Sequence, residues 1–354
     1  MSAIIAPPAT ASTATAPPII TIAGLTKRYK DFTAVDGIDL EVRTGEIFGI
    51  LGPNGAGKTT TLEMIEGLRE PDAGTITLAG FDAVRQSDEV RKIIGVQLQS
   101  TSLFPYLSAG ELIELFGSIY GVANPKARVA ELLDLVGLDA KASARVEQMS
   151  GGQQQRLSIA LALVNNPTVT FLDEPTTGLD PIARRSLWET ILGVRAAGTT
   201  VVLTTHFMEE AEVLCDRIAI MDGGHVIACD TPAGLIRALD LEAKVSATIL
   251  DAGTTPIAED DLRTIAGVSN VTLTPATDGT PPTIALQSRD AQATIVGLLQ
   301  LASARTVTLG ELSSTRASLE DVFLHLTGRT YTQPDVPSRD EAAGGRRSRR
   351  RRQG

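Results

Sequence analysis

Long apolar runs, histidine, cysteine and aromatic residues are all scarce in this chain of 354 residues. No stretch approaches the roughly 20 uninterrupted apolar residues that a membrane helix needs, and the longest runs, such as residues 157–164, have the length of core segments. Three histidines in all argue against a histidine-rich metal site. Cys215 and Cys229 have neither metal-site nor redox spacing, so we expect buried free thiols in a reducing cytoplasm.

The two ends of the chain differ in composition from the rest. Residues 1–17 show no basic segment followed by an apolar one, so they predict a disordered leader and not a secretory signal. The net charge is −10, and because the last nine residues carry six arginines, the rest of the chain carries −16. Such an acidic body predicts no nucleic-acid partner. The arginine run in the tail, residues 331–354, is typical of a solvated, disordered end, with attraction to anionic lipid or RNA as alternatives.

Strand and helix patterns alternate through the larger part of the chain. Apolar strands are expected at residues 46–51, 168–172, 199–205 and 217–221, and helices at 58–68, 182–196 and 208–215. This alternation predicts an α/β fold with a mainly parallel sheet in a first domain, residues 18–240. Residues 107–137 have helical periodicity alone and predict a helical insertion.

A change of pattern after a closing helix at 231–239 predicts a second domain over residues 241–330. Its expected elements follow the order βαββαβ, which is the split, ferredoxin-like α+β arrangement. We expect a last helix at 318–328 to dock on the first domain.

A glycine-rich loop, GPNGAGKT, fits the pattern GxxxxGK[ST] between a predicted strand and a predicted helix. Glycine lets backbone N–H groups approach phosphate, and the helix N-terminus adds partial positive charge. Lys58 can reach the β- and γ-phosphates, and the Thr59 hydroxyl can ligate Mg²⁺. Because a predicted strand precedes the loop and a predicted helix follows it, a chance glycine-rich turn is a much less favourable interpretation. The candidate nucleotide-binding residues are Gly52, Pro53, Asn54, Gly55, Ala56, Gly57, Lys58, Thr59 and Thr60.

Two adjacent carboxylates, Asp173 and Glu174, end a later apolar strand. Asp173 suits the Mg²⁺ shell, because the carboxyl edge of one strand faces the loop after its neighbour. Glu174 is placed to polarise an attacking water. An acidic turn before a proline is the plain alternative, and the upstream Lys58 makes it less favourable. An NKxD guanine reader, which a P-loop GTPase would need, is absent from the sequence.

The remaining motifs make the chain resemble the nucleotide-binding subunit of an ATP-binding cassette (ABC) transporter over roughly residues 19–234. The segment MSGGQ, with Ser150, Gly151, Gly152 and Gln153, is similar to the family signature LSGGQ. The resemblance implies an ABC cassette of the P-loop NTPase class, with a RecA-like core, an antiparallel β subdomain and an α-helical subdomain. It also implies roles for residues outside the phosphate loop. Gln99 is expected to be the Q-loop glutamine near Mg²⁺ and water, with Gln97 as a competing register, and Asp180 is expected in the D-loop. His206 is expected to be the switch histidine at the γ-phosphate, and Tyr29, which could equally be a core residue, the aromatic that stacks on adenine.

The same resemblance implies cofactors and partners. ATP and Mg²⁺ are bound, and the signature of one subunit contacts the γ-phosphate held by another, so we expect a homodimer or heterodimer of such subunits. The end SLEDVFLHLTG and the stretch around Gln99 resemble the daunorubicin-resistance type of drug and polysaccharide exporter ATPases. That type works at the cytoplasmic face of the cell membrane with a separate membrane permease. The alternatives are a non-transport ABC ATPase of translation, repair or regulation, and a regulatory module whose arginine tail binds RNA.

Overall fold

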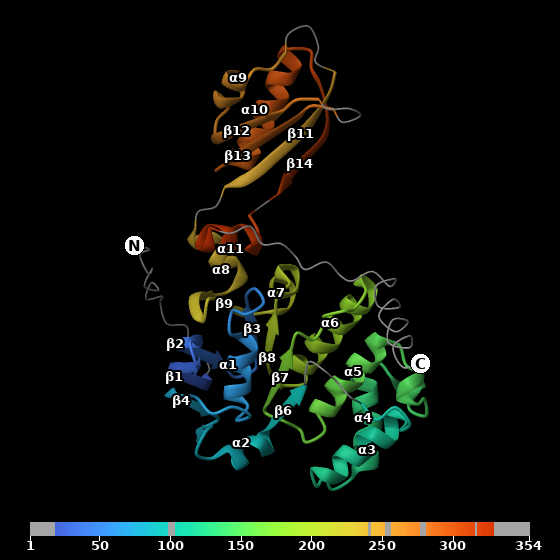
Figure 1. Ribbon diagram of the computed structural model, residues 1–354. Helices are drawn as coiled ribbons and strands as arrows, with labels where there is room; N and C mark the ends of the chain where they lie inside the picture. Colours follow the sequence, from blue (N-terminus) through green and yellow to red (C-terminus); the bar gives the residue numbers. More distant parts are fainter. Residues whose placement is uncertain are drawn as a thin grey trace, which may run out of the picture. The chain divides into compact units, whose positions relative to one another are not determined.

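The computed structural model of the protein describes residues 18–97, 103–239, 242–251, 256–276, 281–315 and 317–328. These residues form two compact units, one up to Pro232 and one from Ala233 onward (Figure 1). No helix in the described ranges is long and apolar enough to cross a membrane. The predicted leader, the predicted tail and Gln99 lie outside the described residues.

A six-stranded sheet in the order β10-β9-β3-β8-β7-β6 forms the centre of the first unit. Neighbouring strands run parallel except β9 and β10, which form a hairpin. Strands β3, β7 and β8 are buried along their whole length, as expected for parallel strands covered on both faces. The prediction of a mainly parallel sheet is confirmed. The strands are β3 (Ile47–Leu51), β6 (Ile94–Gln97), β7 (Val169–Asp173), β8 (Thr200–Thr205), β9 (Arg217–Asp222) and β10 (His225–Asp230).

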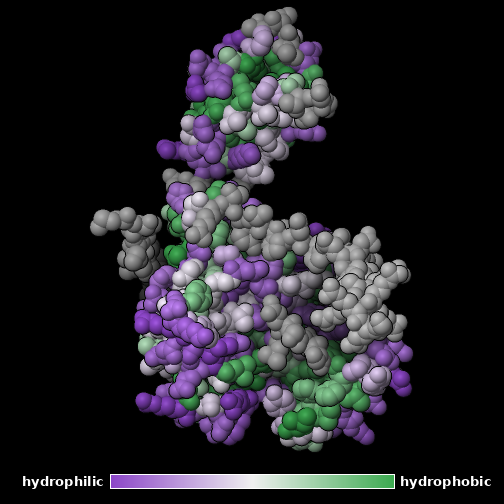
Figure 2. Space-filling model, in the orientation of Figure 1, coloured by the Kyte–Doolittle hydropathy of each residue, from purple (hydrophilic) through white to green (hydrophobic). Residues whose placement is uncertain are grey.

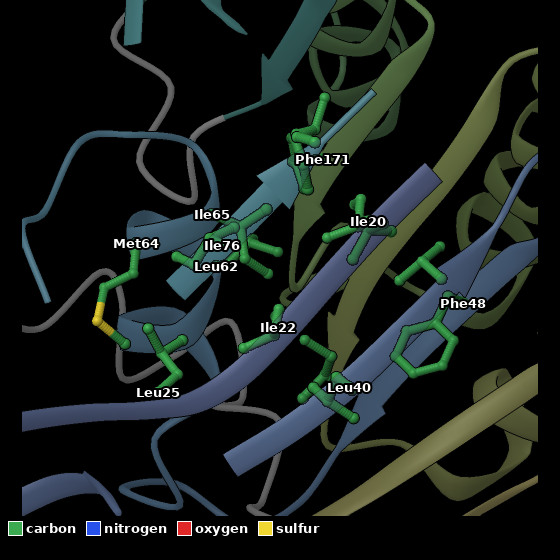
Figure 3. Packing of buried hydrophobic residues seen from close by; sticks show 14 of the residues in the cluster. Ile20, Ile22, Leu25, Leu40, Phe48, Leu62, Met64, Ile65, Ile76 and Phe171 are labelled. Carbon is green, nitrogen blue, oxygen red and sulfur yellow. The ribbon is translucent and has the colours of Figure 1, made fainter. Parts of the chain in front are cut away.

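A second, antiparallel sheet of the order β2-β1-β4-β5 packs with helix α1 (Lys58–Ile65) against one face of the central sheet. Figure 3 shows the core that results, in which Ile20 and Leu40 of this sheet and Leu62 of α1 gather near Phe48 and Phe171 of the central sheet. Burial of such side chains is the main stabilising term of the fold. The strands are β1 (Pro18–Tyr29), β2 (Phe32–Arg43), β4 (Ala73–Leu78) and β5 (Phe81–Asp82).

Helices cover the opposite face of the central sheet. The backbones of strand β6 and helix α5 approach each other closely: a Cβ on Gly95 of β6 would lie 1.8 Å from the Ala162 carbonyl oxygen at the end of α5. Cys215, after α7, is buried as expected, whereas Cys229 is only partly buried. The predicted helical insertion consists of two helices, α3 and α4, which pack on each other and on α5. The helices are α3 (Ala109–Ile119), α4 (Pro125–Leu135), α5 (Gly151–Ala162), α6 (Pro181–Ala196) and α7 (Met208–Leu214), with 3-10 turns at Asp139–Lys141 and Val146–Gln148.

The helix predicted at residues 58–68 is shorter in the structure, where α1 ends at Ile65. Gly67 takes a left-handed φ of 70°, and the N–H of Leu68 donates to the carbonyl of Glu63 at 2.9 Å. This is a glycine-based helix stop, which satisfies carbonyls of the last turn. The sequence patterns also do not predict α2 (Ser87–Ile93) and the four-residue β6, both of which are short.

The second unit contains a four-stranded antiparallel sheet in the order β12-β13-β11-β14. One face of this sheet and helices α9 and α10 enclose a separate apolar core, with Val245, Leu286 and Leu298 fully buried. The elements are α8 (Pro232–Ala238), β11 (Ala243–Asp251), α9 (Glu259–Arg263), β12 (Val268–Thr274), β13 (Thr283–Ser288), α10 (Ala291–Ala304), β14 (Thr308–Thr315) and α11 (Leu319–Thr327). The docking expected of helix 318–328 stays a prediction.

Candidate active site

Three loops meet at the carboxyl edge of the central sheet. They follow β3, β8 and β7, which are adjacent parallel strands. Leu51 pairs with Thr205, and Thr204 pairs with Asp173. Because parallel strands end at the same edge, the phosphate loop, the acidic pair and His206 come together there.

The phosphate loop depends on its glycines. Gly57 is the residue before α1 and has a φ of 101°, and a Cβ there would lie 2.3 Å from the Ala34 carbonyl oxygen. A Cβ on Gly52 would lie 2.3 Å from the Met221 carbonyl oxygen. Only glycine fits these close approaches, and the free N–H groups of the first helical turn remain available to an anion.

Lys58 is 4% exposed, and its ammonium lies within the loop. The Nζ atom donates to the carbonyl oxygens of Gly52 at 2.9 Å and Pro53 at 3.2 Å. It also lies 3.4 Å from Oε1 of Glu174. Burial lowers the pKa of Lys58, while the charges of Glu174 and Asp173 oppose that shift. The phosphate loop therefore holds the Lys58 ammonium close to the carboxylates of Asp173 and Glu174.

Asp173 lies beside the start of α1. The Thr59 hydroxyl donates to its two carboxylate oxygens at 3.2 and 3.1 Å, and the Thr204 hydroxyl donates to Oδ1. Burial raises the pKa of Asp173, and the two hydroxyl donors counteract that shift. An adjacent carboxylate and hydroxyl fit Mg²⁺, which takes one or two protein oxygens and completes its shell with phosphates and water. No cluster of three or more His, Cys, Asp or Glu suited to a metal ion occurs in the described part of the chain.

Glu174 has a left-handed φ of 45°, held by its N–H, which donates to the backbone oxygen and the hydroxyl of Thr204. Its Oε2 lies 3.1 Å from Nδ1 of His206 and accepts a hydrogen bond from the Thr177 hydroxyl at 3.1 Å. Burial alone would raise the pKa of Glu174, but the hydrogen bond from His206 and the charge of Lys58 outweigh it and lower the pKa to about 2. The carboxylate is therefore ionised at neutral pH.

The signature residues begin helix α5 in a solvent-exposed turn. The hydroxyl of Ser150 accepts from the Gln153 N–H, and the Gln153 side chain accepts from the Ser150 N–H, which forms a capping box. A Cβ on Gly151 would meet nothing within 4 Å. Asp180 caps α6 through two backbone N–H groups. Among the described residues, these hydrogen bonds of Ser150, Gln153 and Asp180 stay within the starts of the two helices.

Tyr29 ends β1 and is 37% exposed, so the alternative of a core residue is wrong. The guanidinium of Arg69 lies 5.4 Å from its ring centroid, and Arg69 also pairs with Glu63. Sequence reasoning missed Arg69, since an arginine after a helix carries no motif. It likewise missed Thr204, which is one hydroxyl in an apolar strand.

The two candidate Q-loop glutamines differ in what the structure describes. Gln99 lies outside the described residues. Gln97 is the last residue of β6 and is 2% exposed, and neither polar atom of its amide has a hydrogen-bond partner among the described residues. The choice of Gln99 stays a prediction.

Known proteins are similar to this chain over most of its length. The family model described as "ABC transporter" matches residues 35–177. The chain is 39% identical to Nod factor export ATP-binding protein I of Ralstonia nicotianae, over 88% of this chain and 94% of that protein. It is 37% identical to linearmycin resistance ATP-binding protein LnrL of Bacillus subtilis, over 86% of this chain and 96% of that protein.

Solved structures resemble the first unit. One is an ATP-binding subunit of an ABC transporter, with a TM-score of 0.56 and 29% identity, covering 62% of this chain and 93% of that chain. Another is a dimeric ATP-binding cassette in a post-hydrolysis state bound to ADP and Pi, with a TM-score of 0.54 and 31% identity, covering 60% of this chain and 98% of that chain. With the fold and the edge site described above, these similarities identify the chain as a member of the ABC transporter family, in which it is an ATP-binding, ATP-hydrolysing subunit.

Proposed function

We propose that this ATPase subunit drives export of a drug, lipid or glycan through a separate membrane permease, at the cytoplasmic face of the membrane. The observation that carries the proposal is the extent of the similarity. Relatives named for Nod factor export and for linearmycin resistance align over 94% and 96% of their length. The likeness to these relatives therefore extends past the matched cassette, residues 35–177, into the C-terminal part of the chain.

In the proposed reaction the phosphate loop and the acidic pair have separate tasks. The N–H groups of residues 52–60 and the ammonium of Lys58 hold the phosphates of ATP. Thr59 and Asp173, with Gln99, would hold Mg²⁺, which would supply positive charge to the phosphate oxygens. Glu174, ionised at neutral pH, orients the attacking water and accepts its hydrogen bond.

His206 has two tasks in this proposal. It holds the Glu174 carboxylate, from which its Nδ1 lies 3.1 Å away, and it contacts the γ-phosphate. Tyr29 stacks on adenine with its partly exposed ring.

We further propose that two subunits share each ATP. The γ-phosphate held by the phosphate loop of the partner would be contacted by the signature residues Ser150, Gly151, Gly152 and Gln153. Asp180 would lie near the same boundary between the two subunits. Two observations support this arrangement: Ser150 and Gly151 are exposed at the start of α5, and a similar cassette forms a dimer bound to ADP and Pi. Charge on the γ-phosphate would then favour the closed dimer.

The surface proposed to receive the permease lies on α3 and the loop before it. Ile119 is 68% exposed, and Leu115, Tyr120, Phe104 and Tyr106 are exposed as well. Figure 2 shows hydrophobic residues gathered over the region of α3. Exposed apolar residues that cluster in this way are typical of a protein–protein contact.

Where a hydrophobic, multi-span protein is encoded beside this chain, co-expression with it tests the proposal. We expect Ile119→Glu to leave the ATPase activity of the isolated subunit intact and to abolish its recovery with the membrane protein. Val213→Glu, at another exposed apolar position, on α7, is the matched control and is expected to have no effect. A wild-type chain that sediments with ribosomes or DNA, and not with the membrane protein, would contradict the transport function.

For the second unit we propose the ferredoxin-like fold, which places residues 241–330 in an accessory domain after a nucleotide-binding domain of residues 18–240. The support is the element order β11-α9-β12-β13-α10-β14 together with the sheet order β12-β13-β11-β14. In that sheet the first and third strands are central and antiparallel, as the split arrangement requires.

A further inference from the structure

Glu210 on α7 is a fully buried carboxyl four residues after His206. Its Oε1 accepts a hydrogen bond at 3.2 Å from the indole Nε1 of Trp188 on α6. Burial raises the pKa of Glu210, whereas the hydroxyls of Thr205 and Thr176 favour its ionised form. A buried carboxyl is costly and persists where it is hydrogen-bonded, so its bond with Trp188 holds α7 against α6.

The three polar side chains that stabilise the charge of Glu210 come from three parts of the active-site edge. Thr205 is the last residue of β8 and directly precedes His206, and its hydroxyl accepts the N–H of Phe207 at 2.9 Å. Thr176 is fully buried in the segment that joins Glu174 to Asp180. Trp188 belongs to α6, the helix that Asp180 begins.

A second contact joins α6 to the histidine loop. The guanidinium of Arg184 on α6 lies 4.3 Å from the ring centroid of Phe207. The Phe207 ring centroid in turn lies 4.1 Å from that of His206. Arg184 also supplies the nearby positive charge that favours ionised Glu210. The position of His206 therefore depends on α6 through a stacked side chain and a buried carboxyl.

We propose that Glu210 is a positioning residue for ATP hydrolysis, because its hydrogen bond with Trp188 anchors α7 on α6 and so fixes His206, just before α7, against Glu174. Because Trp188 belongs to the helix that Asp180 begins, the same hydrogen bond also links the histidine loop to Asp180. A change at Asp180, on the side of a partner subunit, is thereby transmitted to the His206–Glu174 pair. This inference rests on the proposed roles of those two residues.

Glu210→Gln tests the proposal, since it keeps the size of the side chain and an acceptor for Trp188 but replaces the second acceptor by a donor. We expect ATP affinity to change less than about twofold and kcat to fall about 10- to 100-fold, the loss typical of a misplaced catalytic group. Trp188 is the single tryptophan of the chain, so its emission reports on this contact. We expect Glu210→Gln to shift that emission and to reduce its response to ATP.

Glu209→Gln is the matched control, because it makes the same change at an exposed neighbour on α7. It is expected to leave kcat and the Trp188 emission unchanged. Trp188→Phe removes only the indole donor and serves as a second variant should Glu210→Gln fold poorly; we expect a several-fold lower kcat with unchanged ATP affinity.

Wild-type kcat in folded Glu210→Gln or folded Trp188→Phe would overturn the proposal. A parallel loss of ATP affinity and kcat would also overturn it, because that result indicates general damage to the site. The proposed roles of the catalytic pair fail separately, if Glu174→Gln still turns over ATP at the wild-type rate.

Discussion

The Nδ1 atom of His206 lies 3.1 Å from Oε2 of Glu174, and this contact joins the residues that follow two neighbouring strands, β8 and β7. On the other side of the same carboxylate, Oε1 lies 3.4 Å from the Lys58 ammonium. One carboxylate thus meets both the phosphate loop and the histidine loop. Its orientation is set further by a left-handed backbone at Glu174 and by the Thr177 hydroxyl.

Replacement of Glu174 by Gln tests its role in hydrolysis. The amide keeps the shape of the side chain but has no charge with which to polarise water, so we expect hydrolysis to fall at least about 100-fold while ATP still binds. The bound ATP is then expected to trap the closed dimer. Steady-state turnover and size-exclusion chromatography with ATP measure the two effects, and normal turnover would remove Glu174 from this role.

The lowered pKa of Glu174 predicts a pH dependence of stability. The folded-state pKa of about 2 lies below the ordinary value of 4.5, so the contribution is full above pH 4.5 and is lost as the pH falls toward 2. The full contribution amounts to about 3 kcal/mol. We expect the difference in urea midpoint between the wild type and Glu174→Gln, followed by Trp188 emission, to be largest at pH 7 and to shrink at pH 3. A difference independent of pH would show that Glu174 is not ionised in this environment.

The site was largely predictable from the sequence because its residues follow apolar strands. Each of Lys58, Asp173 and His206 stands just after or at the end of such a run, and parallel strands place their ends at one edge. The hydrogen bonds that hold the site were not predictable. Thr204, which donates to Asp173, and Glu210, which binds Trp188, look like ordinary strand and helix residues in the sequence.

The errors in the fold have local causes. The sequence favours a helix through residue 68, but the left-handed Gly67 ends α1 three residues earlier. The short β6 depends on pairing with β7, a non-local contact that a four-residue pattern does not reveal. Short elements that are stabilised by tertiary contacts are therefore the ones that sequence patterns miss.

Lys58→Ala is expected to lower nucleotide affinity by at least about tenfold, since charge-assisted bonds to phosphate are among the strongest available. The substitution also leaves the buried Glu174 carboxylate without its nearby ammonium, which works against binding of a polyanion. Equilibrium binding of a fluorescent ATP analogue measures the effect. Unchanged affinity would contradict the phosphate-binding role of the loop.

Gly57→Ala is predicted to be far more harmful than Gly80→Ala, although both glycines have a left-handed φ. A Cβ on Gly80 would meet nothing within 4 Å, so only the backbone penalty of about 1 kcal/mol applies. A Cβ on Gly57 would also collide with the Ala34 carbonyl oxygen and shift the loop. We expect lost ATP binding for Gly57→Ala and normal binding for Gly80→Ala; equal effects would show that the close approach is unimportant.

Mixed subunits separate the two halves of the proposed shared site. Ser150→Arg damages the signature and Lys58→Ala damages the phosphate loop, so each variant alone is expected to be inactive. In a mixed dimer the intact loop of the first variant faces the intact signature of the second, which leaves one complete site of two. With half of the dimers mixed, ATPase activity can reach at most about a quarter of the wild-type value if sites act independently. Activity near the wild-type value in dimers shown to be mixed would argue that the signature does not serve a partner's ATP.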